Sequence, residues 1–265
     1  MKHHLYGFVG TALAPAWALL IAPVPFASAE PCPDVEVVFA RGTTEEPGVG
    51  YIGQSFVDTL RQRVGAKSLD VYPVNYPATS DFPTAIDGIN DAAAHVESMV
   101  ATCPKTKMVL GGYSQGAAVM GFVTANKVPD GAHPMEIPQP MPPEVADHVA
   151  AVTLFGKPSE QFMNLINQPP VTIGPLYTTK TVDLCVPNDP ICAGSGDFAA
   201  HYQYVETGMV EQAVDFAATR IAAGPANAPS ATPSPSRAPS HSPSPAPVAL
   251  PAPSHSPGPA PGPAA

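Results

Sequence analysis

Basic side chains are scarce in this 265-residue chain, which has 12 Lys and Arg against 22 Asp and Glu. The formal net charge at pH 7 is −10, and the few cations are scattered along the sequence. Proteins that bind nucleic acid usually present clustered positive charge to the phosphate backbone. The sequence therefore disfavours a nucleic-acid partner.

A long uninterrupted apolar run is also lacking. Lys2 is followed by a largely apolar stretch, residues 5–26, which three prolines interrupt. A transmembrane helix, the alternative here, needs about 20 consecutive apolar residues. The stretch ends instead in residues 27–29 (ASA), the small-x-small pattern that signal peptidases accept. We interpret residues 1–29 as a signal peptide and expect a secreted protein, either extracellular or associated with the cell wall.

Charge is nearly absent from residues 225–265, where Arg237 is the single charged side chain. Pro, Ala and Ser supply 14, 10 and 8 of these 41 positions. Such a segment buries too little apolar surface to offset the entropy of ordering it. We expect a disordered tail, either a flexible spacer or a stalk that is O-glycosylated or crosses the cell wall. Residues 30–224 then remain as one domain, large enough for a single core.

Cysteines are few, and four remain after the predicted cleavage: Cys32, Cys103, Cys185 and Cys192. An even number in an exported protein favours two disulfides, for which three connectivities are possible. The short spacing of the last two suits a clamp, which leaves Cys32 to pair with Cys103. Zinc is the alternative, but no His or further Cys lies beside them at ligand spacing. We expect no metal.

Apolar periodicity alternates between strands and helices along the predicted domain, and no internal repeat is visible. The expected strands are residues 35–40, 68–74, 107–111, 149–155 and 176–182. The expected helices are residues 54–64, 84–100, 115–125 and 198–223. Parallel strands need such intervening helices, so we predict a three-layer α/β/α sandwich with a mostly parallel central sheet. The Pro-rich stretches 127–143 and 158–175 are expected to be surface loops.

One pentapeptide, residues 112–116 (GYSQG), fits the G-x-S-x-G pattern between a predicted strand and a predicted helix. In a nucleophile elbow the serine occupies a strained turn, and the flanking glycines let strand and helix approach closely. Ser114 is the candidate nucleophile, and the amide of Gln115 would point at a developing oxyanion. The alternative is a tight turn of small residues without catalytic meaning.

A serine nucleophile needs a general base, which follows it in the chain in this fold. Three histidines lie downstream of Ser114 within the predicted domain: His133, His148 and His201. The first two border a Pro-rich loop and are expected to be solvated. His201 follows a glycine-bearing segment at the start of the last predicted helix, and is the best candidate.

The carboxylate that orients the base should precede His201, and three aspartates do so: Asp183, Asp189 and Asp197. Asp189 lies inside the loop between Cys185 and Cys192, which a disulfide would make rigid. Asp183 is expected at a strand end and Asp197 as a helix N-cap. Spacing favours Asp189 and leaves Asp183 as its main rival.

Together these residues resemble the cutinase family, particularly its actinobacterial cutinase-like esterases. The matching segments span nearly all of residues 32–222, and their combination is more specific than any one of them. They are residues 40–45 (ARGTTE), 112–116 (GYSQG), 185–192 (CVPNDPIC) and 201–202 (HY).

The resemblance implies an α/β-hydrolase without a large lid and a catalytic triad of Ser114, Asp189 and His201. It also implies the disulfides Cys32–Cys103 and Cys185–Cys192. The second oxyanion contribution would come from Thr43, where fungal members usually have Ser. Threonine keeps the hydroxyl and the backbone N–H, although its methyl group narrows the site.

The function implied is hydrolysis of short- to medium-chain fatty acid esters through an acyl-enzyme, without a cofactor, by a monomer whose partner is an ester or lipid substrate. The segment between Ser114 and Cys185 is longer than in compact fungal members, so substrate scope does not transfer. One alternative is an acyltransferase of the cell envelope with the same triad. Another is a non-catalytic envelope-binding protein on this scaffold. The Pro-rich tail, outside the catalytic core, is expected to mediate any cell-wall association.

Overall fold

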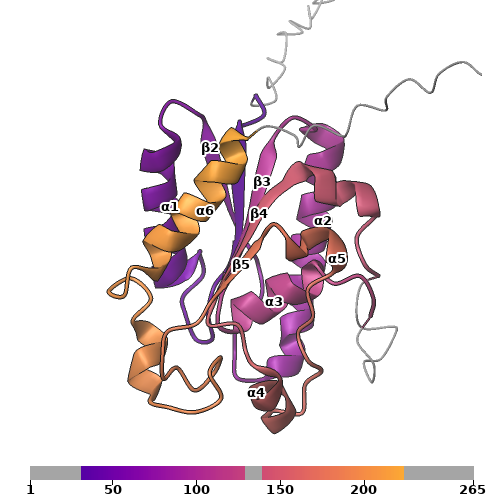
Figure 1. Cartoon of the computed structure of the whole chain (residues 1–265). Helices are drawn as coiled ribbons and strands as arrows, with labels where there is room; N and C mark the ends of the chain where they lie inside the picture. Colours follow the sequence, from indigo (N-terminus) through magenta and orange to yellow (C-terminus); the bar gives the residue numbers. More distant parts are fainter. Residues whose placement is uncertain (1–30, 129–138, 224–265) are drawn as a thin grey trace, which may run out of the picture. The chain divides into compact units, whose positions relative to one another are not determined.

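Five parallel strands form one central sheet in the computed structural model, which describes residues 31–128 and 139–223 (Figure 1). Their order across the sheet is β2-β1-β3-β4-β5, and each neighbouring pair is parallel. The strands are β1 (Val35–Ala40), β2 (Leu69–Pro73), β3 (Lys107–Tyr113), β4 (Val149–Phe155) and β5 (Thr181–Leu184).

Helices cover both faces of this sheet, which confirms the predicted three-layer α/β/α sandwich. Helices α1 and α6 lie on one face, and α2 and α3 lie on the other (Figure 1). The α-helices are α1 (Gly50–Val64), α2 (Ala85–Thr102), α3 (Gln115–Val123), α4 (Glu160–Leu165), α5 (Pro175–Thr178) and α6 (Met209–Ala222). The short 3-10 helices are η1 (Phe82–Thr84), η2 (Pro143–His148) and η3 (Phe198–Tyr202).

Strand β1 shows why these sequences form strands at the centre of the molecule. All six of its residues are buried, as expected of a parallel strand that helices cover on both faces. Because side chains alternate along a strand, Val37 and Phe39 pack with α1 and α6, whereas Val38 and Ala40 pack with α2 and α3. The core therefore has two halves, one on each side of the sheet.

The strand order determines where a ligand can bind. The chain leaves β1 toward α1 on one face, and it leaves β3 toward α3 on the other face, although β1 and β3 are neighbours. Sheets of this kind bind ligands at the carboxyl ends of the strands, where the chain direction diverges. Thr43 follows β1 and Ser114 follows β3, so both belong to this crevice.

Two local predictions are wrong in the segment before the disulfide clamp. Residues 176–182 do not form one strand: the helix α5 comes first, and the strand β5 begins only at Thr181. Gly174 precedes the helix and Pro175 occupies its first position, where the missing N–H of proline is harmless. The stretch 158–175 is not wholly loop, because Ser159 caps the helix α4 by accepting a hydrogen bond from the Phe162 N–H.

The predicted closing helix over residues 198–223 is also wrong, because it is divided. Residues 198–202 form η3, and α6 begins only at Met209. Gly208 separates them with a φ of 73°, a left-handed conformation that glycine adopts without steric cost. His201 therefore belongs to a short 3-10 helix that precedes α6.

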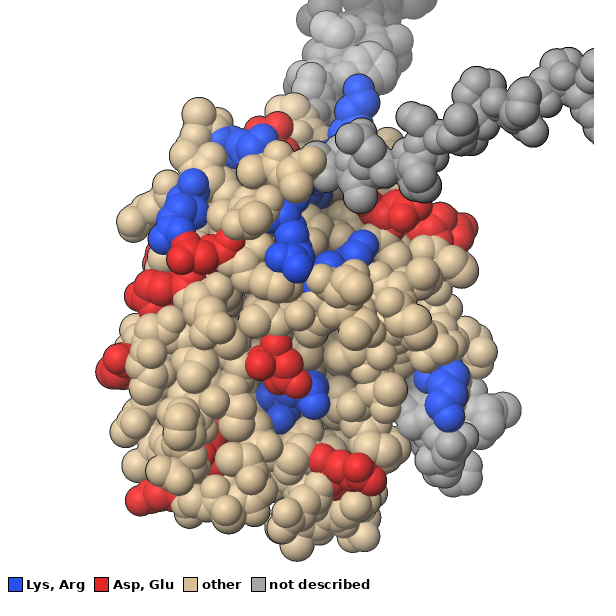
Figure 2. Space-filling model, viewed as in Figure 1, with Lys and Arg blue, Asp and Glu red and all other residues tan. Residues whose placement is uncertain are grey.

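Both disulfides named above are present, Cys32–Cys103 and Cys185–Cys192. On the face shown in Figure 2, Lys and Arg lie beside Asp and Glu and do not gather in one basic patch. Within the described ranges, no helix has the length and apolarity to span a bilayer. The predictions for residues 1–29 and 225–265, and for His133, lie outside the described residues.

Candidate active site

Ser114 occupies a strained turn between β3 and α3. Its φ is 55° and its ψ is −117°, a backbone conformation that costs energy for any residue other than glycine. Its N–H donates to the carbonyl of Phe155 over 2.8 Å. A Cβ on Gly112 would lie 2.2 Å from the Gly116 carbonyl oxygen, and one on Gly116 would lie 1.9 Å from that of Ala40. Both flanking positions therefore require glycine.

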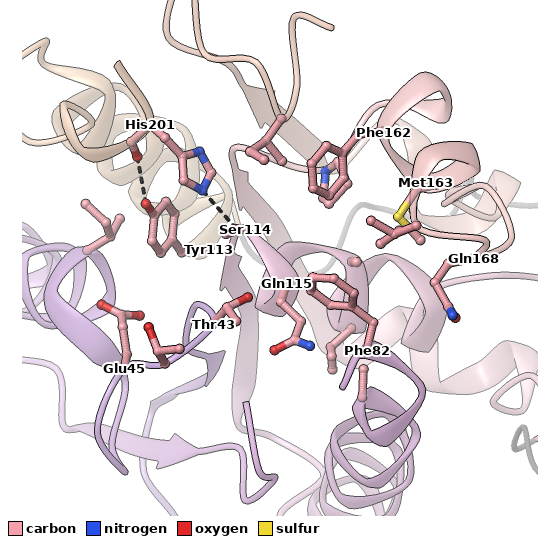
Figure 3. Close-up of a pocket in the computed structure, with 18 of the residues that line it drawn as sticks. Thr43, Glu45, Phe82, Tyr113, Ser114, Gln115, Phe162, Met163, Gln168 and His201 are labelled. Atoms are coloured by element: carbon pink, nitrogen blue, oxygen red, sulfur yellow. Dashed lines mark hydrogen bonds between the residues drawn. The ribbon is translucent and has the colours of Figure 1, made fainter. Parts of the chain in front are cut away.

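His201 contacts the hydroxyl of Ser114 (Figure 3). Its Nε2 lies 2.9 Å from the Oγ of Ser114, and its Nδ1 lies 2.7 Å from the Oδ2 of Asp189. An ionised carboxylate only accepts hydrogen bonds, so Nδ1 donates to Asp189 and Nε2 of the neutral imidazole accepts from the serine. His148, by contrast, is the last residue of η2 and precedes β4. It therefore lies at the amino ends of the strands, whereas Ser114 lies at the carboxyl ends.

Asp189 is fully buried beneath this histidine. Its Oδ1 accepts from the Ile191 N–H over 2.9 Å, and its Oδ2 accepts from the Tyr204 hydroxyl over 2.6 Å as well as from His201. Burial by itself raises the pKa of this carboxyl. The hydrogen bonds from His201, Tyr204 and Ile191 outweigh burial and hold the pKa of Asp189 below its usual value. Asp189 therefore faces the histidine as a carboxylate.

The loop that carries Asp189 is fixed at both ends. The disulfide Cys185–Cys192 closes it, and the Asp189 backbone donates to the Val186 carbonyl and accepts from the Ala193 N–H. The rival Asp183 forms an ion pair with Lys157 over 3.3 Å, away from the histidine. Asp197 caps η3 by accepting from the Ala199 N–H. The structure therefore brings Asp189, and neither alternative, to His201.

The backbone amides of Thr43 and Gln115 are the predicted oxyanion donors. The Gln115 N–H belongs to the first turn of α3, where amides have no partner within the helix. In the loop after β1 the neighbouring Thr44 N–H donates to Ala78 over 2.7 Å, and no acceptor in the described part of the chain is paired with the Thr43 N–H. Both Thr43 and Gln115 line the same cavity as Ser114.

Glu45 holds this loop in place, and sequence reasoning did not single it out. Its carboxylate accepts from the Gly42 N–H over 2.6 Å and from the Tyr51 N–H over 2.8 Å. The buried Arg41 guanidinium supports the loop from below by donating to the carbonyls of Glu45 and Tyr76. Glu45 belongs to the segment 40–45, so a search for loop-capping carboxylates within that motif would have found it.

A cavity of about 480 Å³ opens above Ser114. Figure 3 shows Thr43 and Glu45 on one side of the serine and Phe162, Met163 and Gln168 on the other. The second side is predominantly apolar and combines residues of η1, α3 and α4 with the residue after α4: Phe82, Ala118, Val119, Phe122, Phe162, Met163 and Ile166. In the described ranges no three His, Cys, Asp or Glu residues are grouped as a metal ion would require. The cavity is suited to an apolar chain linked to a polar carbonyl group.

Comparison with known proteins gives one family. The family model described as Cutinase matches residues 31–221. "Probable carboxylesterase Culp5" of Mycobacterium tuberculosis is 61% identical over 172 residues, 65% of this chain and 98% of the relative. "Carboxylesterase Culp1" of Mycobacterium bovis is 48% identical over 224 residues, 82% of this chain and 96% of the relative.

Among solved structures, a Trichoderma reesei cutinase in complex with a phosphonate inhibitor is similar, with a TM-score of 0.56 and 31% sequence identity. The similarity covers 72% of this chain and 78% of the solved one. Sequence and fold therefore indicate the same family.

Proposed function

Because the chain belongs to the cutinase family and is a carboxylic ester hydrolase, we propose that it hydrolyses short- to medium-chain fatty acid esters through an acyl-enzyme on Ser114. One observation carries this proposal. The Oγ of Ser114 lies 2.9 Å from the Nε2 of His201, whose Nδ1 is held by a buried carboxylate, at the base of an apolar cavity.

In the proposed reaction His201 takes the proton of Ser114 as Oγ attacks the ester carbonyl carbon. The amides of Thr43 and Gln115 donate to the oxyanion that forms. When the intermediate collapses, the bond to the alcohol oxygen breaks and His201 gives that oxygen the proton. Water then attacks the acyl-enzyme with His201 again as base, and Ser114 recovers its proton as the fatty acid leaves. Asp189 keeps the imidazole in one tautomer throughout.

The shape and chemistry of the cavity support the acyl preference. Its volume of about 480 Å³ suits a small-molecule substrate, and aromatic and aliphatic side chains form its side toward α4. The exposed aromatic residues Tyr51, Phe198 and Tyr202 lie at the cavity as well, 60% to 66% exposed, which supports an open cleft without a large lid. An acyl chain would extend toward Phe162 and Met163.

The decisive experiment compares Ser114→Ala with Ser98→Ala on p-nitrophenyl esters graded by acyl length. We expect Ser114→Ala to lose about 10⁴-fold or more in kcat, because the nucleophile is removed and the fold is untouched. Ser98 is exposed on α2, so Ser98→Ala should match the wild type. For the wild type, kcat/KM should be highest among short and medium chains. Undiminished hydrolysis by Ser114→Ala would refute the assignment.

The same preparations test the two alternatives. Transfer of the acyl group to an added sugar or lipid hydroxyl, faster than hydrolysis at equal enzyme, would indicate an acyltransferase with the same triad. If a serine-directed phosphonate failed to label the wild type at Ser114, a non-catalytic envelope-binding protein would be the better description. The proposal requires labelling of the wild type and of Ser98→Ala, and none of Ser114→Ala.

We also propose that the protein is exported, that residues 1–29 are removed, and that residues 225–265 associate it with the cell wall. Two disulfides fit an oxidising compartment. The mass of the secreted protein should correspond to a chain beginning at Glu30. Full-length protein should fractionate with the cell wall, whereas protein truncated after residue 224 should be found in the medium. Equal partitioning of the two would contradict a role for the tail in retention.

A further inference from the structure

Tyr204 is a second side-chain partner of the Asp189 carboxylate, beside His201. Its hydroxyl donates to Oδ2 over 2.6 Å, and the same oxygen accepts from Nδ1 of His201 over 2.7 Å. Tyr204 is fully buried and is separated from the histidine by only two residues. Sequence reasoning did not single it out, because it lies outside every matching motif segment.

The fold provides a dedicated place for this hydroxyl. The chain leaves η3 at Tyr202 and begins α6 only at Met209, so Tyr204 belongs to neither helix and its ring is inserted into the core. The ring packs edge-on against Phe155 and Tyr113. A Cβ on Gly156 would lie 2.8 Å from the Tyr204 oxygen, so the space for the hydroxyl exists because that position has no side chain.

We propose that Tyr204 is a positioning residue for the ester hydrolysis proposed above: its hydroxyl fixes the orientation of the Asp189 carboxylate and limits how strongly that carboxylate stabilises the charged form of His201. The inference rests on the proposed function, since it assigns a role within the same site. Tyr204 acts through Asp189 and does not touch the cavity that would hold the substrate.

Hydrogen-bond geometry supports this role. The Ile191 N–H holds Oδ1, and the Tyr204 hydroxyl shares Oδ2 with the imidazole, so both carboxylate oxygens have donors in fixed positions. Without the hydroxyl, Oδ2 would keep only His201 as its side-chain donor. Its negative charge would then act more fully on the imidazolium that forms during the reaction, and the carboxylate would be less constrained in rotation.

Tyr204 can donate throughout the working pH range. Burial, and then the contact with Asp189, raise the pKa of Tyr204 well above its usual value, so the hydroxyl keeps its proton. The titratable groups that face Asp189 in the described residues are His201, Tyr204 and, across the aromatic cluster, Tyr113. Tyr113 also donates to the backbone carbonyl of His201 over 2.7 Å and stacks on its ring.

The first test replaces Tyr204 by Phe and uses Tyr72→Phe as a matched control. The Tyr72 hydroxyl also donates to a carboxylate, that of Asp91 over 3.0 Å, but on α2 and outside the cavity. Tyr204→Phe should lower kcat about 10-fold with little change in KM, because the less constrained carboxylate no longer holds His201 in one orientation and this loss outweighs the stronger stabilisation of the imidazolium. The acid limb of the pH profile of kcat/KM should move to higher pH, because His201 becomes more basic. Tyr72→Phe should change neither quantity.

A merely structural role would lower the melting temperature and leave kcat and the acid limb unchanged, and that result overturns the proposal. A double-mutant cycle with Asp189→Asn separates this inference from the proposed function. If Asp189→Asn keeps full activity, the triad itself is wrong. If Asp189→Asn is impaired, Tyr204→Phe should cause no further loss in that background. An equal fold-loss in both backgrounds overturns the positioning role alone.

If Tyr204→Phe does not fold, an NMR measurement on the wild type tests the proposal. A Tyr204 hydroxyl that donates to Asp189 is shielded from solvent, so its proton should be visible by NMR as a slowly exchanging resonance. That resonance should show a nuclear Overhauser contact with the Nδ1 proton of His201, since both protons point at Oδ2. A wild-type spectrum that contains the His201 proton and lacks this contact would overturn the proposal.

Discussion

The carboxylate of Glu45 holds the loop whose backbone would supply the proposed oxyanion donor, the Thr43 N–H. Its two oxygens accept from the N–H groups of Gly42 and Tyr51, one on each side of Thr43 in the sequence. A Cβ at position 50 would lie 2.1 Å from the same carboxylate, so the chain passes close beneath it. The direction of the Thr43 N–H therefore depends on Glu45 as well as on the local turn, in which the Glu45 N–H donates to the Gly42 carbonyl.

We predict that Glu45→Gln lowers kcat for ester hydrolysis by about 10-fold, a fraction of what loss of a complete oxyanion donor costs. The amide group of glutamine would direct a donor at one of the two N–H groups, and the loop would shift. Glu46→Gln is the matched control, because Glu46 is the next residue and is exposed. Steady-state kinetics and thermal melting of both variants check the prediction. Equal kcat for the two variants would contradict it.

At the scale of residues, some members of the site could be predicted from the sequence and others could not. Ser114 could be predicted because a strand, a G-x-S-x-G pattern and a helix are all local features. Spacing favoured Asp189 but left Asp183 as a rival, since both precede His201. The structure separates them by partner: Asp183 pairs with Lys157, and Asp189 contacts His201. Tyr204 had no local signature, because its significance comes from a contact with a carboxylate 15 residues earlier.

At the scale of elements, the strands were predictable where tertiary packing reinforces a continuous apolar run. The strand β4 has the predicted bounds, and β1 does as well. The helix α1 begins at Gly50, earlier than the predicted 54, because its first turn packs Ile52 and Gly53 against the sheet without a polar cap. Apolar periodicity defines the middle of an element well and its ends poorly.

Elements near the site were predicted least well, and for one shared reason. Residues 198–208 have enough apolar side chains for a continuous helix, yet Gly208 interrupts it and the chain turns so that His201 and Tyr204 both face Asp189. The helix α4 was overlooked because prolines surround it. Its residues form one side of the cavity. Contacts at the edge of the sheet determine the conformation of these segments. Such contacts do not produce a periodic pattern of apolar residues in the sequence.

At the scale of the whole molecule, four buried tyrosines couple stability to alkaline pH. Burial raises the pKa of Tyr76, Tyr113, Tyr177 and Tyr204 above the usual value near 10. Above that pH the unfolded chain releases these protons and the native protein retains them. A raised native pKa therefore gives stability that is complete below about pH 10 and is lost as pH rises toward the native values.

We predict that the free energy of unfolding falls steeply between about pH 10 and pH 11. Each of these tyrosines would contribute about 1.4 kcal/mol per pH unit to the slope. Tyr76→Phe should reduce the slope by about that amount, because it removes one of these phenols. The hydroxyl and the ring of Tyr76 contact Arg41 and not the triad. Denaturant titrations of wild type and variant at several pH values measure this slope. Identical slopes would contradict the prediction.

By itself the sequence determined the layered α/β architecture, the nucleophile turn and the family, because buried strand runs, glycine spacing and short motifs are properties of neighbouring residues. The tertiary structure decided which aspartate meets His201, where the last helix breaks, and that Tyr204 and Glu45 support the site. Ser114 and His201 are 87 residues apart, and their contact depends on how the ends of the strands and the loops after them pack together. Packing across such distances is a property of the folded chain, which no local pattern encodes.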